Sequence, residues 1–169
     1  ESKRFSVVAA GRRSGKTELA KRRLVSLLAL KKNWPDARYF AAAPTRDQAK
    51  RIFWKDLKAM MPKGWVKRIY ESELAIVTRF GSEIWVAGLD KPQRLDGTPW
   101  DGGVLDEFAD MKPGAWAENI RPALSDRAGW CWLIGVPEGF NHFKDIADYA
   151  ASGIDPDWGL YTWMSEDIL

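Results

Sequence analysis

The sequence predicts an α/β domain in which a mostly parallel sheet carries helices on both faces. Its 169 residues suffice for a single domain spanning residues 1–169, and 46% of them are apolar, which is typical of a chain with a packed core. Short apolar stretches of strand length alternate several times with longer stretches of helical periodicity, an order that favours parallel strands joined by helices. A glycine-containing loop joins the first such strand to the first such helix.

The N-terminal third contains two strand–helix pairs. The leucines of the first helix fall near one face, while Lys21, Arg22 and Arg23 fall mostly outside it. Pro44 ends the second strand, and Thr45 is suited to cap the helix that follows. The predicted elements are a buried strand at 4–10, a helix at 17–32, a second strand at 38–43 and a helix at 46–61.

The remainder begins with a segment of two-residue alternation, which predicts two or three short antiparallel strands as a small hairpin insertion. A polar loop then leads to further strand–helix alternation, in which Pro122 is expected to kink or end one helix and Gly153 to close another. The predicted elements are the hairpins at 65–88, strands at 102–107 and 129–135, helices at 112–126 and 140–153, and a last strand from 158.

Composition excludes some classes of protein. The single cysteine, Cys131, cannot form an internal disulfide and lies in an apolar run that predicts burial. No apolar run approaches the length of a membrane span, and no signal peptide is recognisable. The formal net charge of +3 permits a polyanionic partner without demanding one. No cluster of His and Cys with metal-ligand spacing is present in the sequence.

The loop after the first strand matches the phosphate-binding fingerprint G-x-x-x-x-G-K-[ST], except that Ala10 replaces its first glycine. A chance lysine after a glycine turn is the alternative, but the loop lies between a predicted strand and a predicted helix, as phosphate binding requires. Backbone N–H groups of such a loop bind phosphate, Lys16 would neutralise the β- and γ-phosphates of ATP, and Thr17 would bind Mg²⁺. The predicted nucleotide-binding residues are Gly11, Arg12, Arg13, Ser14, Gly15, Lys16 and Thr17.

A second candidate site follows the apolar strand "GGVL". Asp106 would hold Mg²⁺ directly or through water, and Glu107 would act as the general base for an attacking water. An Asp–Glu pair at a solvent-facing strand end is the alternative, but the carboxyl ends of parallel strands are where open α/β sheets bind ligands. Asp101 and Asp110 flank the pair and are expected to be loop or surface carboxylates.

Four segments together resemble a known family. "VVAAGRRSGKTELA", "FAAAPTRDQAKRIFWKDLK", "GGVLDEFADMKPGAWAENIRPALSDRAG" and "WLIGVPEGFNHF" occur in the order found in the ATPase domain of the large terminase subunit of tailed bacteriophages. The resemblance implies a P-loop NTPase with a RecA-like core that hydrolyses ATP with Mg²⁺ to drive double-stranded DNA into a procapsid. It also implies a portal ring and a small terminase subunit as partners, a homo-oligomeric ring, and a place at the procapsid portal in the host cytoplasm.

The resemblance implies roles for several arginines. Arg12, with Arg13 beside it, matches a loop arginine that acts on the γ-phosphate in cis, although Arg13 could equally point to solvent. Arg121 is the first candidate for an arginine that acts in trans on a neighbouring subunit, and Arg127 is the second. Either of these two could instead be an ordinary ion-pair partner of a nearby carboxylate.

The chain also departs from the family pattern. Val136 stands where the family often has a hydroxyl residue in its coupling motif, so Asn141 or His142 would have to replace that hydroxyl, although His142 is expected to be a helix-start or packing residue. A C-terminal nuclease domain would begin beyond Leu169, so this chain is expected to be a trimmed or stand-alone ATPase domain without nuclease activity. The same motifs permit a helicase fragment, or a nucleotide-dependent regulatory module without productive turnover.

The residues that contact DNA are not evident from the pattern. Ten tryptophans could stack on bases, but most lie on predicted helix or strand faces, where core packing is expected, and Trp100 alone, in the loop before the carboxylate strand, is a candidate site residue. Basic side chains on polar faces are candidates for phosphate contacts, although most are expected to be solvated. They are Arg46, Lys50, Lys55, Lys67, Arg68 and Arg79.

Overall fold

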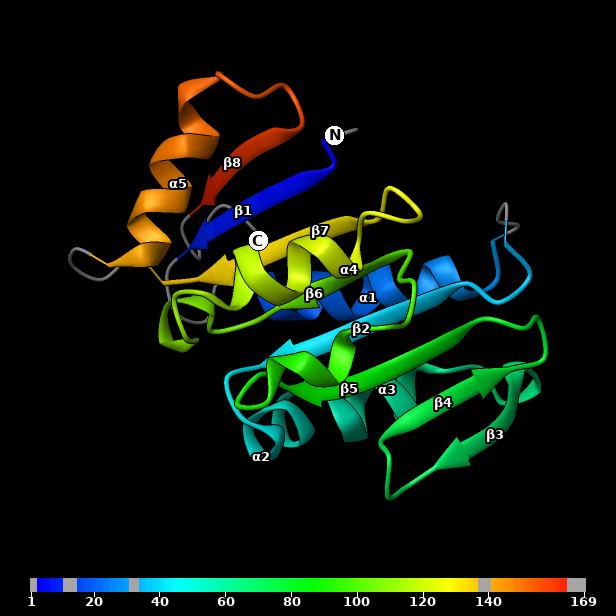
Figure 1. Cartoon of the computed structure of the whole chain (residues 1–169). Helices are drawn as coiled ribbons and strands as arrows, with labels where there is room; N and C mark the ends of the chain where they lie inside the picture. The colour runs from blue at the N-terminus through cyan, green and yellow to red at the C-terminus, as the bar shows by residue number, and fades with distance from the viewer. Residues whose placement is uncertain (1–2, 11–14, 31–33, 137–140, 164–169) are drawn as a thin grey trace.

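The computed structural model describes residues 3–10, 15–30, 34–136 and 141–163. Within these ranges eight strands form one sheet in the order β3-β4-β5-β2-β6-β7-β1-β8 (Figure 1). All neighbouring pairs from β5 to β8 are parallel, whereas β3–β4 and β4–β5 are antiparallel. The strands are β1 (Phe5–Ala10), β2 (Arg38–Ala43), β3 (Val66–Tyr70), β4 (Ala75–Thr78), β5 (Glu83–Gly88), β6 (Gly102–Leu105), β7 (Trp130–Gly135) and β8 (Trp158–Trp163).

Helices cover both faces of this sheet, as the alternation of elements predicts (Figure 1). One face carries α1 (Lys16–Leu28) and a continuous helical segment made of α2 (Arg46–Ala49), the π-helical turn η1 (Lys50–Trp54) and α3 (Lys55–Met60). The other carries the π-helical turn η5 (Trp116–Ile120), α4 (Arg121–Ala123) and α5 (His142–Ser152), with the 3-10 turn η3 (Pro92–Leu95) near β5; a further 3-10 turn, η2 (Lys63–Trp65), precedes β3.

The central strand β2 shows why these residues form a sheet that is buried on both sides. Tyr39, Ala41 and Ala43 pack in the core beneath α1, while Phe40 and Ala42 pack in the core on the opposite face, and all five are fully buried. A strand between two helical layers needs apolar side chains on both faces, so it has a continuous apolar sequence in place of alternation.

The predicted hairpin insertion is part of the main sheet. β3 and β4 form the expected antiparallel hairpin, but β5 pairs antiparallel with β4 on one side and parallel with β2 on the other. The alternation within β5 reflects this position, since Ile84 and Val86 face the α1 layer while Trp85 and Ala87 face the opposite one. Local alternation cannot distinguish the two arrangements, because the partner of β5 lies more than forty residues earlier in the chain.

The helix ends follow local chemistry. Thr45 forms the predicted cap: its hydroxyl accepts from the Gln48 N–H, and the Gln48 side chain accepts from the Thr45 N–H. Pro122 lies in α4, which ends at Ala123, and Gly153 closes α5 with a left-handed φ of 75°. The first helix ends at Leu28, earlier than the sequence pattern indicates.

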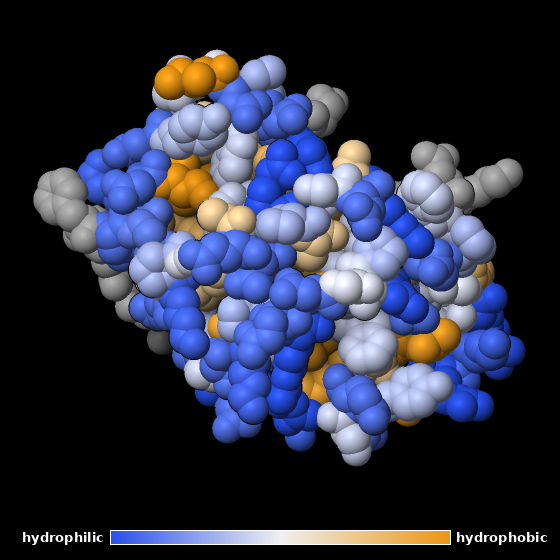
Figure 2. Space-filling model, in the orientation of Figure 1, coloured by the Kyte–Doolittle hydropathy of each residue, from blue (hydrophilic) through white to orange (hydrophobic). Residues whose placement is uncertain are grey.

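Hydrophilic side chains predominate on the face shown in Figure 2, and the hydrophobic ones form small, separate patches. Among the helices of the described ranges, none is both long enough and apolar enough to cross a membrane.

Candidate phosphate-binding site

Asp106 joins the two segments that the sequence analysis singled out. It follows β6 directly and is only 5% exposed. Its Oδ2 accepts a hydrogen bond from the Thr17 hydroxyl at 2.8 Å, and its Oδ1 accepts from the backbone N–H of Glu107, also at 2.8 Å. The start of α1 and the end of β6 are therefore in direct contact, as the two motifs require if they serve one ligand.

Glu107 adopts an unusual backbone conformation. Its φ of 53° and ψ of 44° place it in the left-handed region, which costs a residue with a side chain about 1 kcal/mol. The 3-10 turn η4 (Phe108–Asp110) follows immediately, and Phe108 is buried, so this turn is anchored in the core. Strained conformations of this kind concentrate at functional sites, where they fix the direction of a side chain.

Gly15 occupies the position before the first turn of α1 with a φ of 85°, a conformation that glycine adopts without steric cost. Lys16 and Thr17 then form the first turn, where unpaired backbone N–H groups and the helix dipole favour an anion. The predicted loop residues Gly11, Arg12, Arg13 and Ser14 lie outside the described residues.

A cavity of about 720 Å³ lies where these segments meet. Lys16, Thr17, Asp106 and Glu107 all line it, so the structure brings together the four described residues predicted to serve the nucleotide. The walls come from α1, from the η1–α3 segment, from the turn after β6 and from the end of β7. The remaining lining residues are Lys21, Arg51, Ile52, Asp56, Ala109, Asp110, Gly135 and Val136.

The electrostatic environment of Glu107 suits a group that exchanges protons. Burial raises the pKa of its carboxyl above the ordinary value, and the negative charges of Asp106 and Asp110 raise it further. The positive charges of Arg51 and Lys16 act in the opposite direction and limit the rise in this pKa. A carboxylate whose pKa is raised is a stronger base than one in water.

The donors at this site fit a magnesium ion accompanied by phosphate. Mg²⁺ prefers oxygen ligands and is commonly held by one or two protein groups together with substrate phosphates and water. The Thr17 hydroxyl donates its proton to Asp106, which leaves the lone pairs of its oxygen available to a cation. Within the described ranges no three His, Cys, Asp or Glu side chains cluster as a metal site, so phosphate and water would supply the other ligands.

Several cavity residues were not anticipated from the sequence. Lys21 is buried, because its ammonium group pairs at 2.6 Å with Asp56 of α3. Its spacing of four residues from Thr17, which places both on one helix face, is the signal that could have identified it. Asp110 lines the cavity, whereas it was expected at the surface. Arg51 carries no comparable local signal.

Asp101 was expected to be a loop or surface carboxylate, and this expectation is wrong. Its side chain is 10% exposed and accepts hydrogen bonds from the Arg38 N–H and from Arg127. Arg127 also pairs at 2.9 Å with Asp36 and is itself 9% exposed. Its guanidinium therefore joins two loops of its own chain, which makes it a poor candidate for action on another subunit.

Arg121, the first candidate for a trans-acting residue, lies away from the cavity. Its guanidinium packs over the Phe5 ring at 4.9 Å and forms a long hydrogen bond of 3.4 Å with the Ser125 hydroxyl. Absence from its own cavity is what action on a neighbouring subunit requires, but it applies to many surface residues, so the role of Arg121 stays a prediction.

The segment after β7 replaces the missing hydroxyl in neither of the ways considered above. Val136 lines the cavity, but the Asn141 side-chain oxygen caps α5 by accepting from the N–H groups of Phe143 and Lys144. His142 is the first residue of α5; its Nε2 lies 3.1 Å from the Ala109 carbonyl, and its ring packs 4.9 Å from Phe108. It is thus the helix-start and packing residue that the sequence indicates, and it connects the Glu107 turn to α5.

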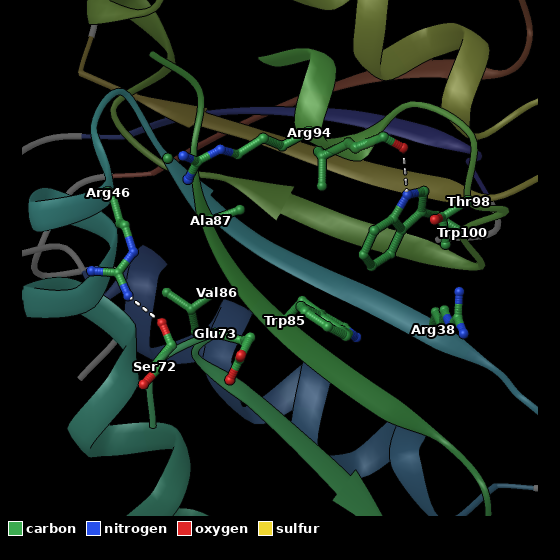
Figure 3. A pocket seen from close by; sticks show the side chains of 12 residues that line it. Arg38, Arg46, Ser72, Glu73, Trp85, Val86, Ala87, Arg94, Thr98 and Trp100 are labelled. Carbon is green, nitrogen blue, oxygen red and sulfur yellow. Dashed lines mark hydrogen bonds between the residues drawn. The ribbon is translucent and has the colours of Figure 1, made fainter. Parts of the chain in front are cut away.

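A second pocket, of about 560 Å³, extends along β5 and contains none of the predicted nucleotide-binding residues. Figure 3 shows Arg46, which donates to the Ser72 carbonyl at 2.6 Å, toward one end and Trp100 toward the other. Trp100 is buried, packs edge-on against Phe40 and donates to the Leu95 carbonyl, so it is a core residue that also borders this pocket.

Comparisons with known proteins agree with this geometry. No family model matches the chain. The large terminase subunits of Thermus phage G20c and Thermus virus P23-45 are each 30% identical to it over 159 residues, which cover 83% of this chain and 32% of each relative. The chain thus spans about a third of the length of these curated relatives.

Solved structures match over more of the fold. The ATPase domain of the Thermus phage P74-26 large terminase superposes with a TM-score of 0.79 at 24% identity, over 96% of this chain and 76% of that one. The large terminase of another thermophilic bacteriophage, solved in complex with ADP, superposes with a TM-score of 0.76 at 16% identity, over 98% and 41%. These matches confirm the predicted RecA-like P-loop fold. By sequence and by fold, the chain is therefore related to the ATPase domains of bacteriophage large terminase subunits.

Proposed function

We propose that this chain is a motor domain that hydrolyses ATP to ADP and phosphate in order to translocate double-stranded viral DNA into a procapsid. The observation that carries the proposal is the convergence of Lys16, Thr17, Asp106 and Glu107 on one cavity. The structural neighbour that binds ADP supports a nucleotide as the occupant of that cavity.

Each residue has a role that follows from its position. The N–H groups at the start of α1 and the Lys16 ammonium hold the phosphates, while Thr17 and Asp106 hold Mg²⁺, which would neutralise charge on the phosphates. Glu107 orients a water molecule and accepts its proton as the water oxygen bonds to the γ-phosphorus. The bond from that phosphorus to the bridging oxygen breaks, and ADP leaves. In this mechanism Arg12 stabilises charge on the transferred group.

The proposal is tested by comparing ATP hydrolysis and nucleotide binding in Glu107→Gln. This variant keeps the size of the side chain but removes the base, so we expect turnover to fall by a factor of about 100 or more while ATP affinity stays within twofold. Asp157→Asn, a change far from the cavity lining, is the matched control. Turnover retained in Glu107→Gln would reject Glu107 as the base.

The wider role rests on relatives that are longer than this chain. We infer a homo-oligomeric ring at the portal, in the host cytoplasm, with the portal ring, the small terminase subunit and double-stranded DNA as partners. A trans-acting Arg121 has a specific test in mixtures of Arg121→Ala with subunits inactivated at Glu107. If Arg121 acts across an interface, activity changes non-linearly with the mixing ratio, whereas strict proportionality would count against that role.

DNA translocation makes a further demand, because motors of this kind grip the phosphate backbone without reading sequence. We therefore expect binding to duplex DNA that is independent of sequence and that weakens steeply between 50 and 200 mM salt, on the order of 10³-fold or more if at least six phosphates are contacted. Binding that depends on sequence, or that salt does not weaken, would contradict a translocation role.

A further inference from the structure

The charged groups that line the phosphate cavity are unequally committed. Lys21 is paired with Asp56, and Asp106 accepts hydrogen bonds from Thr17 and from the Glu107 N–H. Among the residues that the structure describes, neither Lys16 nor Arg51 has a side-chain hydrogen bond or an ion pair to any other. Two cations therefore face the cavity with their charges uncommitted, and only Lys16 belongs to the phosphate-binding motif.

The helix that carries Arg51 is built to face the cavity at that point. In a regular α-helix, residues five apart point about 140° away from each other. The π-helical turn Lys50–Trp54 closes over one more residue per turn, which brings Arg51 and Asp56 toward a common side, and both line the cavity. π-helical turns of this kind are frequent at functional sites.

The turn is also held firmly in place. Phe53 is fully buried and Trp54 is 3% exposed, with the indole N–H of Trp54 donating to Glu71 at 2.8 Å. On the cavity side, the Lys21–Asp56 pair ties α3 to α1. Arg51 itself is exposed, so its guanidinium can meet a ligand without breaking a contact.

The position of Arg51 relative to Glu107 indicates which part of a nucleotide it would meet. Its charge acts on the Glu107 carboxyl together with that of Lys16, so Arg51 lies on the Glu107 side of the cavity. Because Glu107 faces the phosphorus that water attacks, that side would hold the terminal phosphate. A triphosphate and the nearby carboxylates carry more negative charge than Lys16 and one Mg²⁺ neutralise, and a guanidinium can bind phosphate oxygens in a bidentate manner.

We propose that Arg51 binds the γ-phosphate of ATP from the η1 turn and thereby makes the site selective for the triphosphate over the diphosphate. This inference rests on the proposed function, since it assigns a further residue to the same nucleotide site. It also gives the helix after β2 a way to respond to hydrolysis, because Arg51 loses its partner when the γ-phosphate leaves.

The test is a titration of wild type and variants with Mg-ADP and with Mg-ATPγS, which keeps a terminal thiophosphate. A hydrogen bond to a charged group stabilises by about 1.5–3 kcal/mol, so Arg51→Ala should weaken ATPγS binding at least tenfold. ADP binding should stay within twofold. Arg51→Lys should fall between, because it keeps the charge but not the planar guanidinium. Lys55→Ala, an exposed change on the next turn outside the cavity lining, is the matched control.

Other outcomes overturn the inference. Equal weakening of ADP and ATPγS in Arg51→Ala would mean that Arg51 contributes only a general positive potential. Unchanged affinity for both, while Lys16→Ala weakens both, would reject Arg51 alone and leave the proposed function standing. Unchanged affinity in Lys16→Ala as well would reject the nucleotide site itself. Circular dichroism and thermal melts confirm folding, and Arg51→Gln replaces Arg51→Ala if the alanine variant is unstable.

Discussion

The Thr17 hydroxyl lies 2.8 Å from Asp106 Oδ2, although 89 positions separate the two residues in the sequence. This hydrogen bond joins the first turn of α1 to the end of β6 at the point where Mg²⁺ would bind. A carboxylate that orients a metal-binding hydroxyl typically affects metal affinity strongly when it is removed.

We therefore expect Asp106→Asn to weaken Mg-ATPγS binding about 10- to 100-fold and to leave binding of the metal-free nucleotide nearly unchanged. Calorimetric titrations with Mg²⁺ and with EDTA would measure the difference. Asp148→Asn, an exposed carboxylate on α5, serves as the control. A loss of affinity that is equal with and without Mg²⁺ would show that Asp106 has no metal-dependent role.

Glu107 lowers stability at neutral pH in the structure described here. Its pKa is raised in the folded state, so its contribution to the free energy of unfolding is greatest at acidic pH and is lost as the pH rises through that raised value. Glu107→Gln, which cannot ionise, should therefore have the higher melting temperature at pH 8, and the difference should shrink toward pH 4. Melting curves across this range check the sign, and a difference that grows toward acidic pH would contradict the raised pKa.

The same raised pKa predicts how hydrolysis depends on pH. Glu107 acts as a base only when it is ionised, so turnover should decline as the pH falls through a value above that of an ordinary glutamate. Arg51→Ala removes a charge that favours the ionised form and should move this decline to higher pH. Rate measurements at saturating ATP would reveal the shift, and a profile that does not move would argue against coupling between the two groups.

Arg127 is expected to be structural. With 9% exposure and ion pairs to Asp36 and Asp101, its truncation would leave the largely buried Asp101 carboxylate without its cation. We expect Arg127→Ala to lower the free energy of unfolding by about 3 kcal/mol. Arg22→Ala, at an exposed helical pair, should change it by less than about 0.5 kcal/mol. Urea titrations compare the two, and near-equal effects would contradict the structural role.

The Lys21–Asp56 pair offers a further comparison. Asp56→Ala leaves the buried Lys21 ammonium without its partner at 2.6 Å, and we expect a loss of about 2 kcal/mol in the free energy of unfolding. Glu18→Ala, which breaks the exposed pair with Arg22, is the control and should cost a few tenths of that. Because α1 and α3 both line the cavity, nucleotide affinity should also fall in Asp56→Ala, and unchanged affinity would show that the pair only stabilises the fold.

The sequence could predict the parts of the site that depend on local pattern. Lys16 and Thr17 follow a strand and begin a helix, and Asp106 and Glu107 end an apolar strand, so strand order alone brings them to one edge of the sheet. Thr45 and Gly153 likewise act within a few residues of their own positions. In each case the determining interaction lies within one element or one turn.

The parts that could not be predicted depend on distant partners. Lys21 is buried because Asp56 lies 35 positions later, and the pairing of β5 with β2 is equally non-local. Arg51 faces the cavity only because a π-helical turn shifts its direction, and no residue pattern in "KRIFW" distinguishes that turn from an α-helical one. The Asp101–Arg127 pair also joins loops that local patterning treats as independent.

The most direct test of the central claim is to map where the nucleotide binds. Amide chemical shifts of the labelled protein, followed during titration with Mg-ATPγS, distinguish the phosphate cavity from the pocket along β5. We predict that the largest changes occur at Lys16, Thr17 and Glu107, with little change at Trp85 and Thr98. Changes concentrated at Trp85 and Thr98, with Lys16 and Glu107 unaffected, would contradict the account.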